Sequence, residues 1–101
     1  MLVIHAEIRI PANEVETLAA VAMPMCEKSE AEEGCYLYAF SVDVSEPGLV
    51  RITEEWESQE ALDAHFQTPH MDDFQAGMAG LTSPNVKATK FLVSSSEDMM
   101  G

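Results

Sequence analysis

Two histidines and one glutamate in the middle of this chain are the side chains best suited to proton chemistry. His65 comes four residues after Ala61 and three after Leu62, so in a helix it would lie on the apolar face. An imidazole exchanges protons near neutral pH, and a histidine facing an apolar interior could therefore serve as a general base. The alternative is a core histidine whose ring nitrogens are hydrogen-bonded to neighbours. The spacing alone leaves both interpretations open.

His70 and Glu54 are the other candidates for catalysis. His70 begins the next predicted helix, where it could act as a neutral acceptor or simply be a partly exposed first-turn residue. Glu54 shares one face of a predicted strand with Trp56. A carboxylate buried there needs a partner, so Glu54 either orients a histidine or pairs with Arg9 or Arg51. An ion pair is the role we expect for Glu54.

Aromatic and sulfur-containing side chains are frequent around these candidates. Flat, polarizable side chains of this kind can line a pocket for a small aromatic substrate, and they can equally form the core. Those that we expect to bind substrate are Trp56, Tyr38, Phe74, Met78 and Phe66.

The elements that must position these residues follow from the periodicity of apolar side chains. Alternation predicts strands, apolar residues three and four apart predict helices, and Gly, Pro, Ser and Asn mark turns. Asn13 with Glu16 has the form of a capping box, and Pro24 should kink or break the first helix. The predicted order is a strand over 2–10, a helix over 13–34, strands over 35–43 and 49–56, short helices from Ser58 and from Thr68-Pro69, and a strand over 86–93.

This order of elements predicts an α+β fold in which a four-stranded antiparallel sheet carries its helices on one face. We expect residues 1–95 to form one domain and residues 96–101 to be a flexible tail, because the tail has too little apolar content to pack. The first strand has one apolar face and one mixed face, and the mixed face carries His5, Glu7 and Arg9. We expect a second copy of the sheet to cover this face in a homodimer.

Composition excludes several classes of function. The chain has 101 residues, with 18 acidic and 5 basic side chains and a formal net charge of −13, which repels nucleic acids and anionic membranes. It has no apolar run near the roughly 18 residues that span a bilayer and no secretory leader pattern, so we expect a cytoplasmic protein. Phosphate-binding glycine loops, serine-hydrolase elbows and metal-ligand spacings are missing, so we expect neither cofactor nor metal.

Three short motifs stand out: Glu54-x-Trp56 at the end of a strand, Ala61-Leu62-x-x-His65 on the next helix, and Glu33-Gly34-Cys35-x-x-Tyr38 at the start of the second strand. Together they resemble the antibiotic biosynthesis monooxygenase (ABM) superfamily. The resemblance implies a ferredoxin-like βαββααβ fold that pairs as a dimeric α/β barrel.

The same resemblance implies a cofactor-independent monooxygenase that oxidises a small phenolic or hydroquinone compound with dioxygen, and His65 would take the phenolic proton. The sequence leaves two alternatives open. One is a proton-transfer isomerase of the same superfamily, and the other is a non-catalytic ligand-binding or stress-associated dimer. Members of the haem-degrading branch carry an Asn on the first strand, whereas residues Val3 to Arg9 contain none. We therefore do not expect haem degradation.

Overall fold

The computed structural model describes all residues from 1 to 101 and confirms the predicted fold class. Its helices and strands are β1 (Leu2–Arg9), a 3-10 turn (Ala12–Glu14), α1 (Val15–Glu30), β2 (Cys35–Val42), β3 (Leu49–Trp56), α2 (Gln59–His65), α3 (Pro69–Met78) and β4 (Asn85–Leu92). This is the ferredoxin-like order of strands and helices. None of the helices combines the length and apolar character that a membrane crossing requires.

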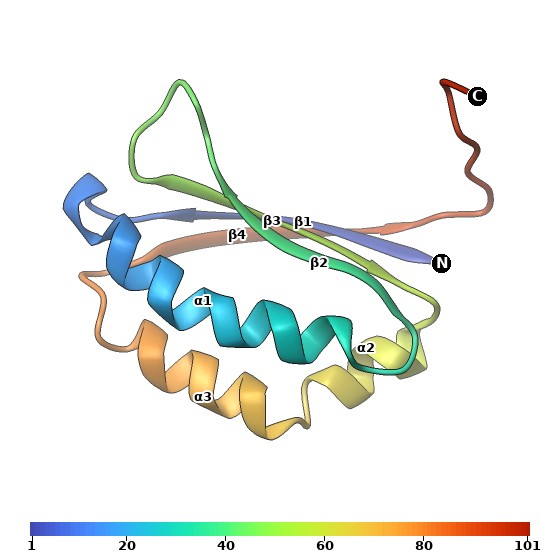
Figure 1. Cartoon of the computed structure of the whole chain (residues 1–101), viewed down its shortest axis with the longest axis horizontal. Helices are drawn as coiled ribbons and strands as arrows, with labels where there is room; N and C mark the ends of the chain where they lie inside the picture. The colour runs from blue at the N-terminus through green and yellow to red at the C-terminus, as the bar shows by residue number, and fades with distance from the viewer.

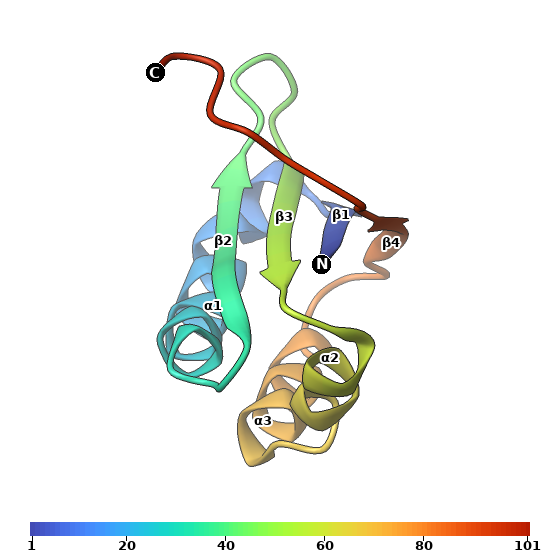
Figure 2. The same cartoon turned by 90° about the vertical axis from the view of Figure 1, so that its right-hand side faces the viewer.

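The four strands form one antiparallel sheet in the order β2-β3-β1-β4, and all three helices pack on the same face of it (Figures 1 and 2). The register aligns Tyr38 of β2 with Glu54 of β3, Glu54 with Ile4 of β1, and Ile4 with Lys90 of β4. Because side chains directly opposite each other in a sheet point to the same side, these four residues form a row across the helix-covered face.

The core lies between the sheet and the helices. Leu2, Ile4, Ala6 and Ile8 alternate along β1 and are all buried, as the sequence pattern predicts. Trp56 at the end of β3 is completely buried. The two central strands, β1 and β3, therefore supply most of the buried residues of the sheet.

The start of α1 differs from the prediction, and of the kink or break expected at Pro24 the break does not occur. Asn13 does not cap the helix, because it lies within the 3-10 turn and the N-cap residue is Glu14, which makes no capping bond with its side chain. Pro24 does not break the helix either, since α1 continues from Val15 to Glu30. Pro24 and Ala20 are both exposed, so water can bind the Ala20 carbonyl that lacks an N–H partner.

An irregularity in β2 also departs from simple alternation. The pairing with β3 shifts between Cys35 and Leu37, so Tyr36 has no partner in the ladder and is exposed. The extra residue moves Cys35 to the core side, where it packs against the hydrophobic cluster, although strict alternation places it opposite Tyr38. Burial raises the pKa of the Cys35 thiol to about 11, which keeps it protonated.

The two short helices begin as predicted. The Ser58 hydroxyl accepts a hydrogen bond from the Ala61 N–H at 3.2 Å, and the Thr68 hydroxyl accepts one from the Met71 N–H at 3.3 Å. Gly77 then lets α3 approach α1, because a Cβ at this position would lie 2.6 Å from a methyl carbon of Val21. These contacts fix α2 and α3 below the sheet beside α1.

The opposite face of the sheet has no helix over it. It carries exposed ion pairs in which Glu7 bonds both Arg9 and Arg51, at 3.0 and 2.9 Å. His5 lies on the same face, edge-on to Phe91 with ring centroids 5.2 Å apart. The dimer contact proposed for His5, Glu7 and Arg9 stays a prediction.

Candidate active site

A cavity of about 400 Å³ opens between the sheet and the helices α2 and α3. Most of its lining is hydrophobic, and it includes the aromatic rings of Tyr38, Phe66 and Phe74. A volume of this size suits a small ligand of one or two rings. Three of the five residues predicted to bind substrate therefore line one cavity.

Glu54 is the only carboxyl group in the wall of this cavity. Its side chain is buried, with 8% of the residue exposed, and its Oε1 accepts a hydrogen bond from Trp56 Nε1 at 2.9 Å. Burial raises the pKa of Glu54, the negative charge of Glu32 adds to this effect, and the Trp56 bond opposes it. Glu54 therefore loses its proton at a higher pH than an exposed glutamate does.

The ion pair expected for Glu54 is wrong. Arg9 pairs with Glu7 and Glu46, and Arg51 pairs with Glu7 and Asp43. Both arginines lie on the uncovered face of the sheet, whereas Glu54 points to the helices because it alternates with Thr53 and Glu55. A single indole N–H is the only protein hydrogen-bond partner of Glu54.

Tyr38 lies next to Glu54 on the neighbouring strand and also lines the cavity. Burial raises the pKa of the Tyr38 phenol, and the charge of Glu54 adds to this effect. Tyr38 therefore stays protonated and can donate a hydrogen bond into the cavity.

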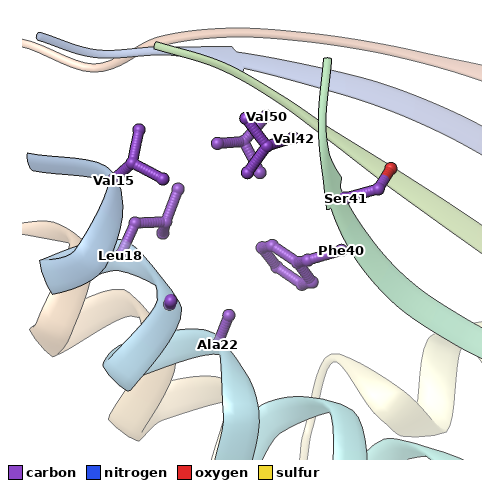
Figure 3. Close-up of a pocket in the computed structure, with 8 residues that line it drawn as sticks. Val15, Leu18, Ala22, Phe40, Ser41, Val42 and Val50 are labelled. Carbon is purple, nitrogen blue, oxygen red and sulfur yellow. The ribbon is translucent and has the colours of Figure 1, made fainter. Parts of the chain in front are cut away.

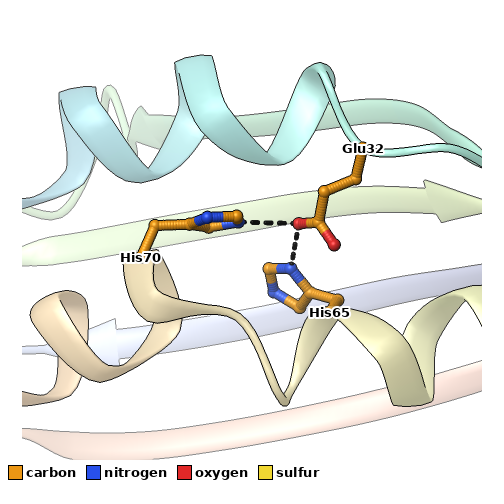
Figure 4. A group of neighbouring side chains, drawn as sticks. All are labelled: Glu32, His65 and His70. Carbon is orange, nitrogen blue, oxygen red and sulfur yellow. Dashed lines mark hydrogen bonds and ion pairs between the residues drawn. The ribbon is translucent and has the colours of Figure 1, made fainter.

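His65 and His70 meet at a different carboxylate (Figure 4). Glu32, which follows α1, places its Oε2 2.6 Å from Nδ1 of His65 and 2.8 Å from Nε2 of His70. The His65 ring is 1% exposed and lies against Trp56 and Tyr38, with ring centroids 4.8 and 5.3 Å apart. The three residues tie the end of α1 to both short helices, and we call them the Glu32 cluster.

The Glu32 cluster does not line the cavity. His65 Nε2 is buried without a hydrogen-bond partner, and Nδ1 is engaged by Glu32. The three possible ligand atoms of the cluster lie within 4.8 Å of one another, which is close enough for a metal ion. However, a histidine that binds a metal through one ring nitrogen normally donates a hydrogen bond from the other, and His65 Nε2 has no acceptor. The donor set thus fits a hydrogen-bonded tie between helices better than a metal site.

The remaining predicted residues are core residues. Trp56 and Met78 are buried but do not line the cavity, and Trp56 instead holds Glu54 through its indole N–H. Sequence reasoning missed Glu32, because it is one of several acidic residues around Gly34 and nothing in its spacing distinguishes it. The motif Glu33-Gly34-Cys35 directly follows it and is the one signal that could have drawn attention to it.

A smaller cavity of about 150 Å³, one of several others, lies between α1 and the strands β2 and β3 (Figure 3). Val15, Leu18, Phe40 and Val50 surround it, and the hydroxyl of Ser41 points away from it. It contains no group that could move a proton. The cavity beside Glu54 is therefore the better candidate for chemistry.

Comparison with known proteins agrees with this architecture. The family profile described as "Antibiotic biosynthesis monooxygenase" matches residues 1–77. A candidate antibiotic biosynthesis monooxygenase from Deinococcus radiodurans has a similar structure, with a TM-score of 0.87, 25% identity and coverage of 100% of both chains.

Two curated proteins are similar in sequence. The uncharacterized protein sll1783 of Synechocystis is 33% identical over 73 residues, which are 72% of this chain and 50% of that protein. The probable quinol monooxygenase YgiN of Escherichia coli K12 is 39% identical over 57 residues, which are 48% of this chain and 55% of YgiN. The chain thus spans about half the length of these curated relatives. Since the family profile covers most of the chain, including β1 to α2 and nearly all of α3, the protein belongs to the antibiotic biosynthesis monooxygenase family.

Proposed function

We propose that this protein is a cofactor-independent monooxygenase that oxidises a small phenol or hydroquinone in the cavity between the sheet and α2 and α3. The observation that carries the proposal is the position of Glu54, a buried carboxyl group with a raised pKa in the wall of a largely hydrophobic, aromatic cavity. A carboxylate in such a site is a stronger base than in water, which suits the removal of a phenolic proton. The similarity to a probable quinol monooxygenase supports the same class of substrate.

The proposed reaction needs no electron donor other than the substrate. Glu54 takes a proton from one hydroxyl of a hydroquinone, and the resulting anion transfers electrons to dioxygen. A carbon–oxygen bond forms at a ring carbon that carried hydrogen, and the O–O bond then breaks. The hydroquinone becomes a hydroxyquinone, and the second oxygen atom leaves as water with the two remaining protons. Tyr38 donates a hydrogen bond to the substrate oxygen in this scheme, and the hydrophobic wall keeps bulk water from the intermediate.

We assign the predicted histidines a supporting role. Glu54 reaches the cavity, whereas His65 and His70 are both engaged by Glu32 outside its wall. In this proposal the Glu32 cluster positions α2, and thereby Phe66 and the side of the cavity that α2 provides. His65 and His70 act on the reaction through that geometry and not as proton acceptors.

We also propose that two copies pair through their uncovered sheet faces. The face opposite the helices carries Val3, Leu37 and Ala39 beside its ion pairs, and Phe91 of β4, which aligns with Val3 on this face, is 46% exposed. Sedimentation at micromolar protein concentration should give twice the monomer mass. A folded monomer under these conditions would contradict the proposed pairing.

Oxygen uptake tests the proposed reaction. Chelator-treated protein with 1,4-naphthohydroquinone should consume dioxygen and form the 2-hydroxy-1,4-naphthoquinone faster than buffer alone. Turnover of the probe under argon would favour the proton-transfer isomerase instead. Binding of the probe without turnover in either gas would favour the non-catalytic dimer.

A further inference from the structure

Two oppositely charged side chains stand at the two ends of the cavity floor. Glu54 and Lys90 both align with Ile4 of β1, from the strands on either side of it. Neighbouring strands lie about 4.8 Å apart, so the backbones of Glu54 and Lys90 are roughly 10 Å apart with Ile4 between them. Both side chains line the cavity. The floor therefore has an acidic end, an apolar centre and a basic end.

The charge of Lys90 is not neutralised by the protein. Its Nζ donates a hydrogen bond to Oε1 of Gln59 at 2.7 Å, and it forms no ion pair with a carboxylate. Gln59 is in turn held by Asp63 at 2.8 Å. A neutral amide thus holds the ammonium group at the cavity and leaves its positive charge available.

A lysine without a carboxylate partner is unusual in a chain with 18 acidic and 5 basic residues. Of the five basic residues, Arg9 and Arg51 are paired with carboxylates, and Lys28 and Lys87 do not line the cavity. Lys90, which forms no ion pair although the chain has 18 acidic residues, is the only basic residue in the cavity lining. A single ammonium group matches a single carboxylate, whereas a dianionic phosphate would leave one negative charge uncompensated in a chain of net charge −13.

We propose that the substrate of this cavity is a hydroxyaromatic acid, whose hydroxyl group lies at Glu54, whose ring lies over Ile4, and whose carboxylate binds Lys90. This inference rests on the proposed function, since both place a hydroxyaromatic ring beside Glu54. It adds that Lys90 selects anionic rings over neutral rings of the same shape. Gln59 is the positioning residue for Lys90.

Calorimetric titration with two matched probes tests the selection. The probes are 6-hydroxy-2-naphthoate and its neutral, nearly isosteric amide, 6-hydroxy-2-naphthamide. We expect the wild-type protein to bind the acid about tenfold more tightly than the amide, the effect of one charge-assisted hydrogen bond. Lys90→Gln should reduce this ratio to about one, because it removes the charge and keeps a polar side chain.

Lys87→Gln is the matched control, because Lys87 lies on the same strand but aligns with Glu7 on the uncovered face of the sheet. It removes the same charge from the chain and should leave the acid-to-amide ratio unchanged. Equal binding of the two probes by the wild-type protein, or an unchanged ratio in Lys90→Gln, would overturn the inference and leave the proposed function standing. If neither probe binds, the cavity does not accept hydroxyaromatic rings, and both proposals fail.

Discussion

Glu54 and Glu32 are two carboxyl groups below the same sheet, and their surroundings differ. Glu32 Oε2 is shared by two imidazole nitrogens, at 2.6 and 2.8 Å, and its cluster joins three helices. Glu54 has one partner, the indole N–H of Trp56, and its other side faces the cavity. A carboxylate with several hydrogen-bonded partners is held in one position and stabilises the fold. A buried carboxylate with one partner and an open side is free to bind or deprotonate a ligand.

Replacing Glu54 should have the largest effect on turnover. Glu54→Gln keeps the shape and an oxygen that can accept the Trp56 bond, but it removes the base. We expect turnover of a hydroquinone to fall by about 10²–10⁴-fold, the usual contribution of general-base catalysis. Circular dichroism should show an unchanged fold.

Glu55→Gln is the control for this change, because Glu55 is the next residue of β3 and points to the uncovered face. It should retain nearly full activity. A Glu54→Gln protein with wild-type turnover would remove the distinction between the two carboxyl groups.

Replacing Glu32 should chiefly affect stability. In Glu32→Gln the amide oxygen can still accept a hydrogen bond from each imidazole, but it carries no negative charge, so both hydrogen bonds become weaker. We expect a loss of about 1–3 kcal/mol in the free energy of unfolding, measured in urea. Turnover per folded molecule should stay within a few-fold of wild type.

Glu33→Gln serves for comparison here, since the neighbouring Glu33 is exposed and makes no side-chain hydrogen bond. Its stability should match that of wild type. If Glu32→Gln or His65→Gln were fully stable but lost activity as strongly as Glu54→Gln, the Glu32 cluster would be catalytic and our assignment would be reversed.

The raised pKa of Glu54 predicts how the stability of the wild-type protein changes with pH relative to that of Glu54→Gln. Its pKa is raised in the folded state, so the folded protein holds a proton that the unfolded chain has already lost above about pH 4.3. The contribution of protonated Glu54 is therefore complete at low pH and is lost as the pH rises through the folded-state value. Relative to wild type, Glu54→Gln should become more stable as the pH rises from 4.5 to 8. Urea unfolding of both proteins at the two pH values measures this difference, and a constant difference would contradict the raised pKa.

Removing the tail should have the smallest effect. Residues 96–101 are all exposed, and neither Glu54 nor Glu32 contacts them. Deleting Ser96 to Gly101 should leave the melting temperature and the turnover nearly unchanged. A large drop in either would show that the tail belongs to the folded unit or to a partner contact.

The fold could be predicted from the sequence because the signals for its strands and helices lie in short segments of the chain. Alternation along β1, the caps Ser58 and Thr68, and the apolar spacing of the helices each depend on residues close together in the chain. Two features differed from the simple pattern. The first is Pro24, which α1 accommodates because the hydrogen bond that it cannot make lies on the exposed side of the helix. The second is the extra residue at Tyr36, which moves Cys35 to the other side of β2. No residue type in this segment marks the irregularity.

The site was less predictable because it joins distant parts of the chain. Glu32 bonds His65 and His70 across separations of 33 and 38 residues. Glu54 and Lys90 line the same cavity only because both align with Ile4, from the strands on either side of it. Sequence spacing placed both histidines near the short helices but could not tell which carboxylate they would share. It also could not exclude an ion pair between Glu54 and an arginine, since that depends on which face of the sheet each residue occupies.

The position of a bound phenol tests the central claim most directly. A crystal structure of the protein with 2-naphthol, which has no second hydroxyl to support quinone formation, should place the ring in the cavity beside Phe74. Its hydroxyl oxygen should lie within hydrogen-bonding distance of the Glu54 carboxyl group. Density for the ring in the apolar cavity between α1 and β2, or with its hydroxyl on His65 after movement of α2, would contradict the account.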